Sequence, residues 1–317
     1  MDLAAVRTLA EGLRRELARV VVGHDEATDL MLIALLAEGH VLLEGAPGVG
    51  KTILARTFAA SLSLRFNRVQ FTPDLMPGDV VGANVFDFRT GQFALTRGPI
   101  FTDLLLADEL NRTPPKTQAA LLQAMQEREV TIDGTTHPLG AAFMVVATQN
   151  PLENEGVYPL PEAQLDRFLF KIDLGYPTRD EERKLVRLHG KGAAKAPAAF
   201  GVTAVGGPAE LAAAREAAAA VRLEDPVADY IVDLVRATRE TPELSCGASP
   251  RAAALLAASS RAAAALDGRD YVLPDDVQRL ADHLLPHRVV VSSTAELDGR
   301  TARDLVRGVV QAVPAPR

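Results

Sequence analysis

The sequence has one cysteine, Cys246, and no tryptophan among its 317 residues. A single cysteine cannot form an internal disulfide or a cysteine-rich zinc site, which favours a reducing compartment. No stretch reaches the roughly 18 consecutive apolar residues that a membrane span needs. Basic residues number 34 against 41 acidic ones, and this net charge of −7 disfavours a protein with a broad basic face for duplex DNA. We therefore expect a soluble, cytoplasmic protein with no membrane insertion and no nucleic acid partner.

Length and composition are those of an ordinary globular protein. At about 150 residues per domain, the chain is long enough for about two domains. Hydrophobic residues make up 48% and charged residues 24% of it, which is too apolar for a disordered chain. The sequence opens with an acidic amphipathic pattern from Met1, which is not typical of a signal peptide.

Short apolar runs alternate with helical patterns in the first half of the chain. The runs expected to form buried strands are residues 41–43, 65–71, 100–107, 143–148 and 168–174. Such an alternation predicts an α/β domain with a parallel sheet and helices on both faces. After residue 175 the pattern changes to a charged helix at 179–189, a Gly-, Ala- and Pro-rich linker at 190–208, and alanine-rich helices. We predict an α/β domain over residues 1–175, and a linker and all-helical domain over residues 176–317.

Two segments of the first domain break the alternation. Residues 80–95 place phenylalanines on either side of Arg89-Thr90-Gly91-Gln92, and residues 129–139 contain the two-residue turn signal Asp133-Gly134. Both segments are predicted to be inserted β-hairpins.

A glycine-rich motif lies between a predicted strand and a predicted helix. Residues 45–52 have the sequence Gly45-Ala46-Pro47-Gly48-Val49-Gly50-Lys51-Thr52, which matches the phosphate-loop pattern in full. Its backbone N–H groups and the following helix N-terminus suit phosphate oxygens. Lys51 is expected to reach the β- and γ-phosphates of a nucleotide, and Thr52 to bind Mg²⁺.

Paired carboxylates end the apolar strand at 100–107. In a phosphate-loop protein this end of the strand faces the nucleotide. Asp108 is expected to hold Mg²⁺ through water, and Glu109 to orient and deprotonate the attacking water. The second carboxylate favours an ATP hydrolase over a small-molecule kinase.

These motifs resemble those of the AAA+ ATPases, and specifically of the MoxR family. Nearly the whole chain takes part in the resemblance. Its matching segments are residues 45–52, 108–116, 118–130, 147–151, 160–168 and 249–252. The resemblance implies an AAA+ phosphate-loop domain with a C-terminal helical lid, assembled into a ring, with six subunits as the expected number. It also implies a chaperone-like ATPase that remodels or matures a client, with a von Willebrand factor A domain protein as partner.

The resemblance assigns roles to three further residues. Asn150 matches the sensor-1 position beside the γ-phosphate, and Arg167 matches an arginine finger donated to the neighbouring subunit. Arg251 matches sensor 2, acting either on its own nucleotide or on a neighbour's. The simpler interpretations are a surface asparagine, a salt bridge of Arg167 with Asp166 or Glu162, and a plain helix start at Arg251.

The sequence departs from the family at one position. Val21-Val22-Gly23 is followed by His24 where the family often has glutamine, so the contact with adenine is left open. The pair His283 and His287 is interrupted by Pro286, and we expect no metal site there.

Several alternatives remain open at this stage. A DNA-translocating motor resembling the minichromosome maintenance helicases would share both hairpins, and a magnesium-chelatase-like ATPase subunit differs only in its partners. A sigma-54 activator would carry a Gly-Ala-Phe-Thr-Gly-Ala loop, which the sequence lacks. A nucleotide-sensing scaffold would not need Glu109, Asn150 and Arg167 together.

Overall fold

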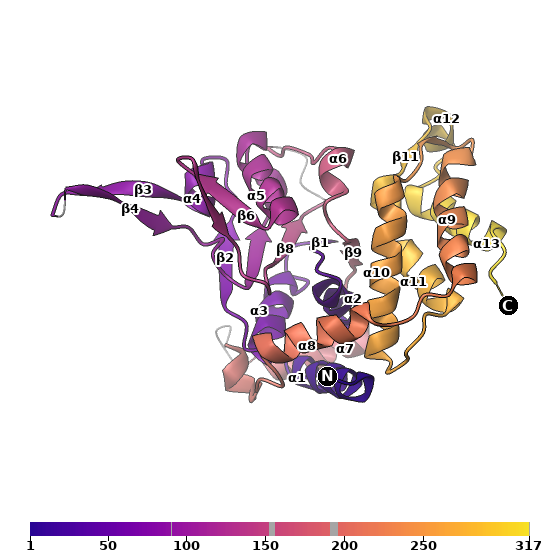
Figure 1. The fold of residues 1–317 in the computed structure, drawn as a ribbon, viewed down its shortest axis with the longest axis horizontal. Coiled ribbons are helices and arrows are strands. Elements are labelled where there is room, and N and C mark those ends of the chain that lie inside the picture. Colours follow the sequence, from indigo (N-terminus) through magenta and orange to yellow (C-terminus); the bar gives the residue numbers. More distant parts are fainter. Residues whose placement is uncertain (90, 152–155, 191–195, 317) are drawn as a thin grey trace.

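A computed structural model describes residues 1–89, 91–151, 156–190 and 196–316 of the chain. Its centre is a five-stranded parallel sheet (Figure 1). The strands are β1 (Val41–Gly45), β2 (Phe66–Gln70), β5 (Leu104–Asp108), β8 (Met144–Gln149) and β9 (Phe170–Leu174). They lie in the order β2-β5-β8-β1-β9, so that β1 is flanked by β8 and β9. The predicted parallel α/β fold is confirmed.

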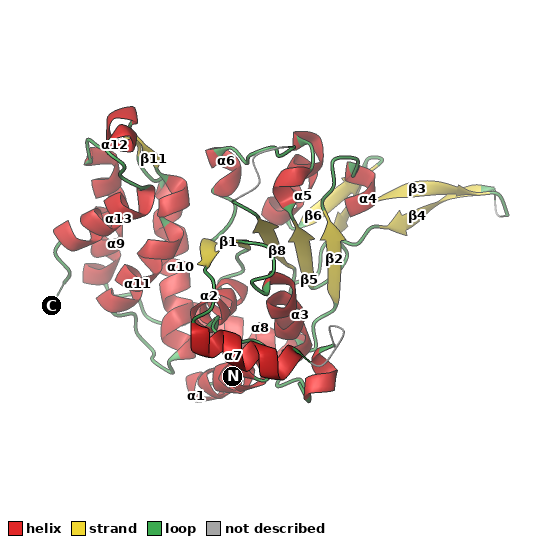
Figure 2. Ribbon diagram, turned by 180° about the vertical axis from the view of Figure 1, so that it is seen from behind, coloured by secondary structure: helices red, strands yellow, loops and turns green. Residues whose placement is uncertain are grey.

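The strands are buried on both faces because successive side chains point to opposite sides of a sheet. Leu43 and Leu106 pack into one hydrophobic cluster, whereas Leu42 and Leu105 pack into another. Helices α2 (Asp25–Leu36) and α3 (Lys51–Ser61) cover the first face, and α1 (Leu3–Ala18) packs against both of them. Helix α5 (Pro115–Glu127) covers the other face (Figure 2).

Four of the five predicted strands begin one to four residues later than expected: β2 and β8 by one residue, β9 by two, and β5 by four. Residues 100–103 were assigned to the strand that ends at 107, but β5 starts at Leu104. The Ile100 N–H donates instead to the carbonyl of Val80, at the end of the short helix α4 (Pro77–Val81). The apolar run therefore continues through a turn that ties α4 to the sheet.

Two hairpins interrupt the layers. The first, made of β3 (Gly82–Asp87) and β4 (Gln92–Arg97), projects far from the body, and Thr90 in its predicted turn lies outside the described residues (Figure 1). The second consists of β6 (Glu129–Ile132) and β7 (Thr135–Pro138). Its turn residues Asp133 and Gly134 have φ angles of 47° and 79°. The Asn84 side chain donates to Asp133 over 2.9 Å and thereby joins the two hairpins.

The chain returns to the α1 side of the sheet after β9. It forms α7 (Arg179–His189), η2 (Pro197–Phe200) and α8 (Pro208–Ala219). Residues 191–195 of the predicted linker lie outside the described part of the chain. His189 Nε2 donates to the Val20 carbonyl over 2.9 Å, and the Val205 N–H donates to the Ser61 carbonyl over 2.9 Å.

A separate group of helices follows at the C-terminal side (Figure 1). Its members are α9 (Asp225–Glu240), α10 (Pro250–Leu266), α11 (Pro274–Leu284), η3 (Pro286–Arg288), α12 (Ser293–Leu297) and α13 (Ala302–Ala312). The predicted helical lid is confirmed with one correction, because β10 (Leu244–Cys246) and β11 (Val290–Val291) add a small antiparallel sheet. The predicted division of the chain at residue 175 stays a prediction. No helix within the described residues has the length and hydropathy needed to span a bilayer.

Candidate functional site

The phosphate-loop motif connects β1 directly to α3. Gly45 is the last residue of β1, and a Cβ atom there would lie 2.6 Å from the Leu174 carbonyl oxygen. Gly48 and Gly50 have φ angles of 86° and 98°, which favour glycine. The loop therefore turns sharply, and its N–H groups lie beside the N-terminus of α3. Both stabilise a bound anion.

Lys51 and His24 hold the loop from two sides. Lys51 Nζ donates to the carbonyls of Gly45 over 2.5 Å and Ala46 over 3.1 Å. His24 is buried, and its Nε2 donates to the Val49 carbonyl over 2.7 Å. The histidine that departs from the family pattern thus supports the phosphate loop itself.

Asp108 ends β5 in a buried position, where both oxygens of its carboxylate accept hydrogen bonds. Its Oδ1 accepts from the Thr148 hydroxyl over 2.7 Å. Its Oδ2 accepts from Arg68 Nε over 3.0 Å and from Nη2 over 2.7 Å. Arg68 lies on β2, the strand next to β5, so the neighbouring strand orients the carboxylate that is expected to serve Mg²⁺.

Glu109 leaves the strand in the left-handed region, with φ 57° and ψ 50°. A non-glycine residue in this region is unusual, and such residues cluster at functional sites. Its backbone N–H donates to the Thr148 hydroxyl over 2.9 Å. Its side-chain Oε2 accepts from Gln70 Nε2 over 2.6 Å and lies 3.2 Å from Arg112 Nε, in the turn η1 (Leu110–Arg112). The Glu109 carboxylate is therefore positioned by β2 and η1.

The loop and the strand ends share one pocket of about 340 Å³. The pocket is lined by Pro47, Gly48, Gly50, Lys51, Thr52, Ile53, Asp108, Glu109 and Asn150. Asn150 directly follows β8 and is buried. Most of the predicted nucleotide-site residues thus surround a single cavity at the carboxyl ends of β1, β5 and β8.

The pocket also offers oxygen donors for a magnesium ion. The hydroxyl of Thr52 and the carboxylate of Asp108 both line it, and Mg²⁺ prefers oxygen ligands with several positions left to water and phosphate. No group of three or more Asp, Glu, His or Cys side chains that could hold a metal occurs in the described part of the chain. The oxygen atoms of Thr52 and Asp108 fit a magnesium ion that is bound together with a nucleotide.

Arg167 and Arg251 do not line this pocket. Arg167 lies in the turn between α6 (Glu162–Leu165) and β9, where it is half-buried. Among the described residues it forms no ion pair, so the alternative salt bridge with Asp166 or Glu162 is not formed.

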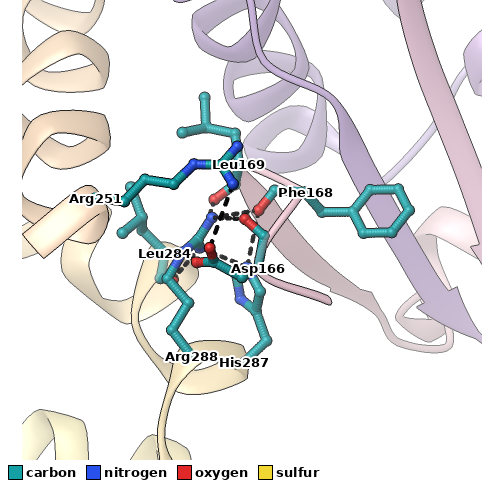
Figure 3. Close-up of polar contacts among 7 residues, drawn as sticks. All are labelled: Asp166, Phe168, Leu169, Arg251, Leu284, His287 and Arg288. Carbon is teal, nitrogen blue, oxygen red and sulfur yellow. Dashed lines mark hydrogen bonds and ion pairs between the residues drawn. The ribbon is translucent and has the colours of Figure 1, made fainter. Parts of the chain in front are cut away.

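Asp166 is paired instead with two arginines of the lid. Arg288 Nε lies 2.8 Å from its Oδ1, and Arg251 Nη1 lies 3.4 Å from its Oδ2 (Figure 3). Arg251 is the second residue of α10 and has 44% of its side chain exposed. The two predicted arginines therefore share one region, on the lid side of the turn before β9.

Four polar residues of the site escaped prediction: Arg68, Gln70, Arg112 and Thr148. Two of them lie on β2, and their importance depends on β2 pairing with β5, with Gln70 opposite Asp108. Their polar character near the end of a predicted strand was the only signal available in the sequence.

The other candidate side chains have separate surroundings. His283 Nε2 lies 3.2 Å from Glu26 on α2, whereas His287 Nε2 lies 3.0 Å from the Phe168 carbonyl. Cys246 lies exposed in β10.

Two sequence models match the chain. One, the ATPase family associated with various cellular activities (AAA), matches residues 40–170, and an AAA lid domain matches residues 236–309.

Individual proteins are similar over nearly the whole length. The chain is 43% identical to Chaperone MoxR1 of Mycobacterium tuberculosis, over 99% of this chain and 84% of that protein. It is 32% identical to Protein MoxR of Methylorubrum extorquens, over 98% and 96% of the two chains. The crystal structure of a candidate ATPase from Cytophaga hutchinsonii superposes with a TM-score of 0.91 at 37% identity, covering 99% of this chain and 97% of that one.

Proposed function

This chain belongs to the MoxR family of AAA+ ATPases, and from that membership we propose that it uses ATP hydrolysis to remodel or mature client proteins. ATP binding and hydrolysis follow from the family. The observation that carries the proposal is the single pocket in which the phosphate loop meets Asp108, Glu109 and Asn150.

The residues of the pocket divide the work of hydrolysis. The N-terminus of α3 and the loop N–H groups bind the phosphates, and Lys51 turns from the loop carbonyls to the β- and γ-phosphates. Thr52 and Asp108 hold Mg²⁺, which when bound neutralises phosphate charge. Glu109 accepts a proton from the attacking water, and Asn150 orients that water beside the γ-phosphate.

A ring, with six subunits, completes the site. AAA+ ATPases usually act as oligomers, and Arg167 and Arg251 lie outside the pocket of their own chain. In the proposed ring Arg167 reaches the nucleotide of the neighbouring subunit and stabilises the charge that develops during phosphoryl transfer. Arg251 lies in the lid next to Asp166. This position favours a contact of Arg251 with the nucleotide of the neighbouring subunit over a contact with the nucleotide of its own subunit.

The hairpins provide surfaces for the client. Phe88 and Phe93 on the first hairpin are 91% and 71% exposed, which suits contact with apolar side chains of another protein. We propose a von Willebrand factor A domain protein as the partner, and a reducing compartment, which the unpaired Cys246 favours, as the location.

The test combines hydrolysis, assembly and partner binding. The purified chain should hydrolyse ATP only with Mg²⁺, and Glu109→Gln with ATP should sediment as a hexamer. The same ATP-loaded variant should bind a purified von Willebrand factor A domain protein, whereas Lys51→Ala should not. Stimulation of hydrolysis by DNA, without any partner binding, would overturn the chaperone proposal in favour of a DNA motor.

A further inference from the structure

Arg288 is a buried lid residue for which the nucleotide pocket gives no role. It ends η3, and only 1% of its side chain is exposed. Arginine is almost never fully buried unless it is paired. The hydrogen bonds and ion pairs of Arg288 therefore indicate its role.

Those bonds reach the turn that carries Arg167. Arg288 Nε donates to Asp166 Oδ1 over 2.8 Å, and Nη2 donates to the carbonyls of Asp166 over 3.0 Å and Phe168 over 2.5 Å (Figure 3). Its Nη1 donates to the Leu169 carbonyl over 3.1 Å. One guanidinium thus binds the backbone on both sides of Arg167.

The same guanidinium is fixed within the lid. Nη1 also donates to the carbonyl of Leu284, the last residue of α11, over 2.5 Å. His287 Nε2 lies 2.5 Å from Nη1, and burial lowers the pKa of His287 well below its ordinary value, so that this imidazole stays neutral. Burial lowers the pKa of Arg288 to about 10, which still leaves it charged at neutral pH. Asp166 is therefore the carboxylate that pairs with a cation held by the lid.

The α/β domain holds the turn from the other side. The Phe168 side chain is buried in a hydrophobic cluster of the α/β domain, and that of Leu169 in the cluster which this domain shares with the lid. The Leu169 N–H donates to the His40 carbonyl over 2.7 Å. Figure 3 shows the Phe168 ring pointing away from Arg288, toward the α/β domain. Between these anchors, Arg167 forms no ion pair with any residue that the structure describes.

We infer that Arg288 is a positioning residue for Arg167, fixing the arginine finger to the lid of its own subunit. This inference rests on the proposed function, because it takes Arg167 to act on a neighbouring nucleotide. Its consequence is that the lid and the finger move together. A displacement of the lid in one subunit then changes hydrolysis in the adjacent one, while nucleotide binding in the first stays intact.

The experiment uses Arg288→Lys in the full-length oligomer. Lysine keeps the charge near Asp166, but as a single ammonium it cannot donate to carbonyls on both sides of Arg167. Misplacement of a catalytic group by about 1 Å can lower a rate by ~10²-fold. We therefore expect kcat to fall by ~10²-fold, with KM for ATP nearly unchanged. Asp166→Asn, which keeps the side-chain volume, should lower kcat in the same direction.

Two readouts separate positioning from loss of folding. The double variant Arg167→Ala/Arg288→Lys should be no slower than Arg167→Ala, because a missing finger cannot be misplaced. Arg288→Lys subunits mixed with Lys51→Ala subunits should regain hydrolysis, since the neighbour then supplies a correctly placed Arg167. Arg269→Lys is the matched control: Arg269 binds Asp276 over 2.7 Å within the lid and lies beyond the C-terminal end of α10, whereas Arg251 lies at the N-terminal end of that helix. Its change should leave kcat within about twofold.

The outcomes distinguish the inference from the proposed function. If Arg167→Ala behaves as a finger variant and is rescued by Lys51→Ala, but Arg288→Lys multiplies its defect or is not rescued, the positioning role alone is overturned. If Arg167→Ala retains full activity or cannot be rescued, the shared site fails, and the inference fails with it.

Discussion

Gln70 Nε2 donates to Glu109 Oε2 over 2.6 Å, which joins the end of β2 to the expected catalytic base. This hydrogen bond occupies one of the two oxygens through which the Glu109 carboxylate can accept a water proton. Arg112 Nε, 3.2 Å from the same oxygen, adds a positive charge. Glu109 is therefore held in an orientation that two other side chains determine.

Removal of this hydrogen bond should raise basal hydrolysis. A net hydrogen bond is worth about 0.5–1.5 kcal/mol, and 1.36 kcal/mol corresponds to tenfold in rate. Gln70→Ala should therefore hydrolyse ATP up to about tenfold faster in the absence of a client. Steady-state phosphate release measures this. A fall in rate would mean that Gln70 orients Glu109 for catalysis.

Lys51 and Glu109 should fail in different ways. Lys51→Ala removes the cation that faces the phosphates and should weaken ATP binding, whereas Glu109→Gln keeps the size of the side chain and should still bind ATP. Loss of a general base typically lowers the rate by ~10²–10⁴-fold. Fluorescent-nucleotide titration and single-turnover hydrolysis separate the two effects. Equal losses of nucleotide affinity would contradict this division of roles.

Local chemistry made the nucleotide pocket predictable. Strand, glycine-rich turn and helix follow one another within a few residues at 45–52, and each feature has a signature in the sequence. Gln70 and Arg68 were missed because their roles depend on β2 lying next to β5, a matter of sheet order.

Contacts between residues that are far apart in the sequence were still harder to predict. Arg288 meets Asp166 across 122 positions of the chain, and neither residue forms part of a local pattern. The apolar run at 100–103 predicted a strand because burial alone does not distinguish a buried turn from a buried strand.

The second hairpin, made of β6 and β7, should be needed for client-dependent activity but not for ATP hydrolysis itself. Its turn residues Asp133 and Gly134 adopt left-handed conformations at the surface, away from the pocket lining. Deletion of the two residues should leave basal hydrolysis unchanged and abolish the stimulation by a bound partner protein. Asp133→Asn is the control, because asparagine tolerates the left-handed region. Collapse of basal hydrolysis in a folded deletion variant would show that the hairpin supports Asn150.

The folded protein should lose stability as the pH falls, because His40 is buried in its neutral form. Its Nδ1 accepts from the Val145 N–H over 2.9 Å, its Nε2 donates to the Met125 carbonyl over 3.0 Å, and burial lowers its pKa to about 3. The unfolded chain, with an ordinary pKa of about 6.5, binds a proton that the folded chain excludes. The free energy of unfolding should therefore fall by up to about 1.4 kcal/mol per pH unit from pH 6.5 toward 3.

The variant His40→Gln cannot take up this proton. It should be less stable at pH 7 but should lose less stability between pH 6.5 and 4.5 than the natural sequence. Urea unfolding at several pH values measures both slopes. Parallel slopes would show that His40 does not control this part of the acid response.

Mixed oligomers should reveal whether one site is built by two subunits. Arg167 is half-buried, lies outside the pocket of its own chain and has no ion-pair partner among the described residues. An arginine finger is worth ~10³–10⁵ in rate, or roughly 4–7 kcal/mol. Arg167→Ala should therefore bind ATP with near-normal affinity and hydrolyse it very slowly.

Mixing Arg167→Ala with Lys51→Ala should restore part of the activity of two inactive variants. An Arg167→Ala subunit keeps an intact phosphate loop, and a Lys51→Ala neighbour keeps an intact finger, so that a mixed interface contains one complete site. Activity should peak at an intermediate ratio and vanish at either end, while mixing either variant with itself restores nothing. Native mass spectrometry shows whether mixed rings form. If they form and their hydrolysis stays at the level of the separate variants, Arg167 has only a structural role in its own turn and does not act on the neighbouring nucleotide.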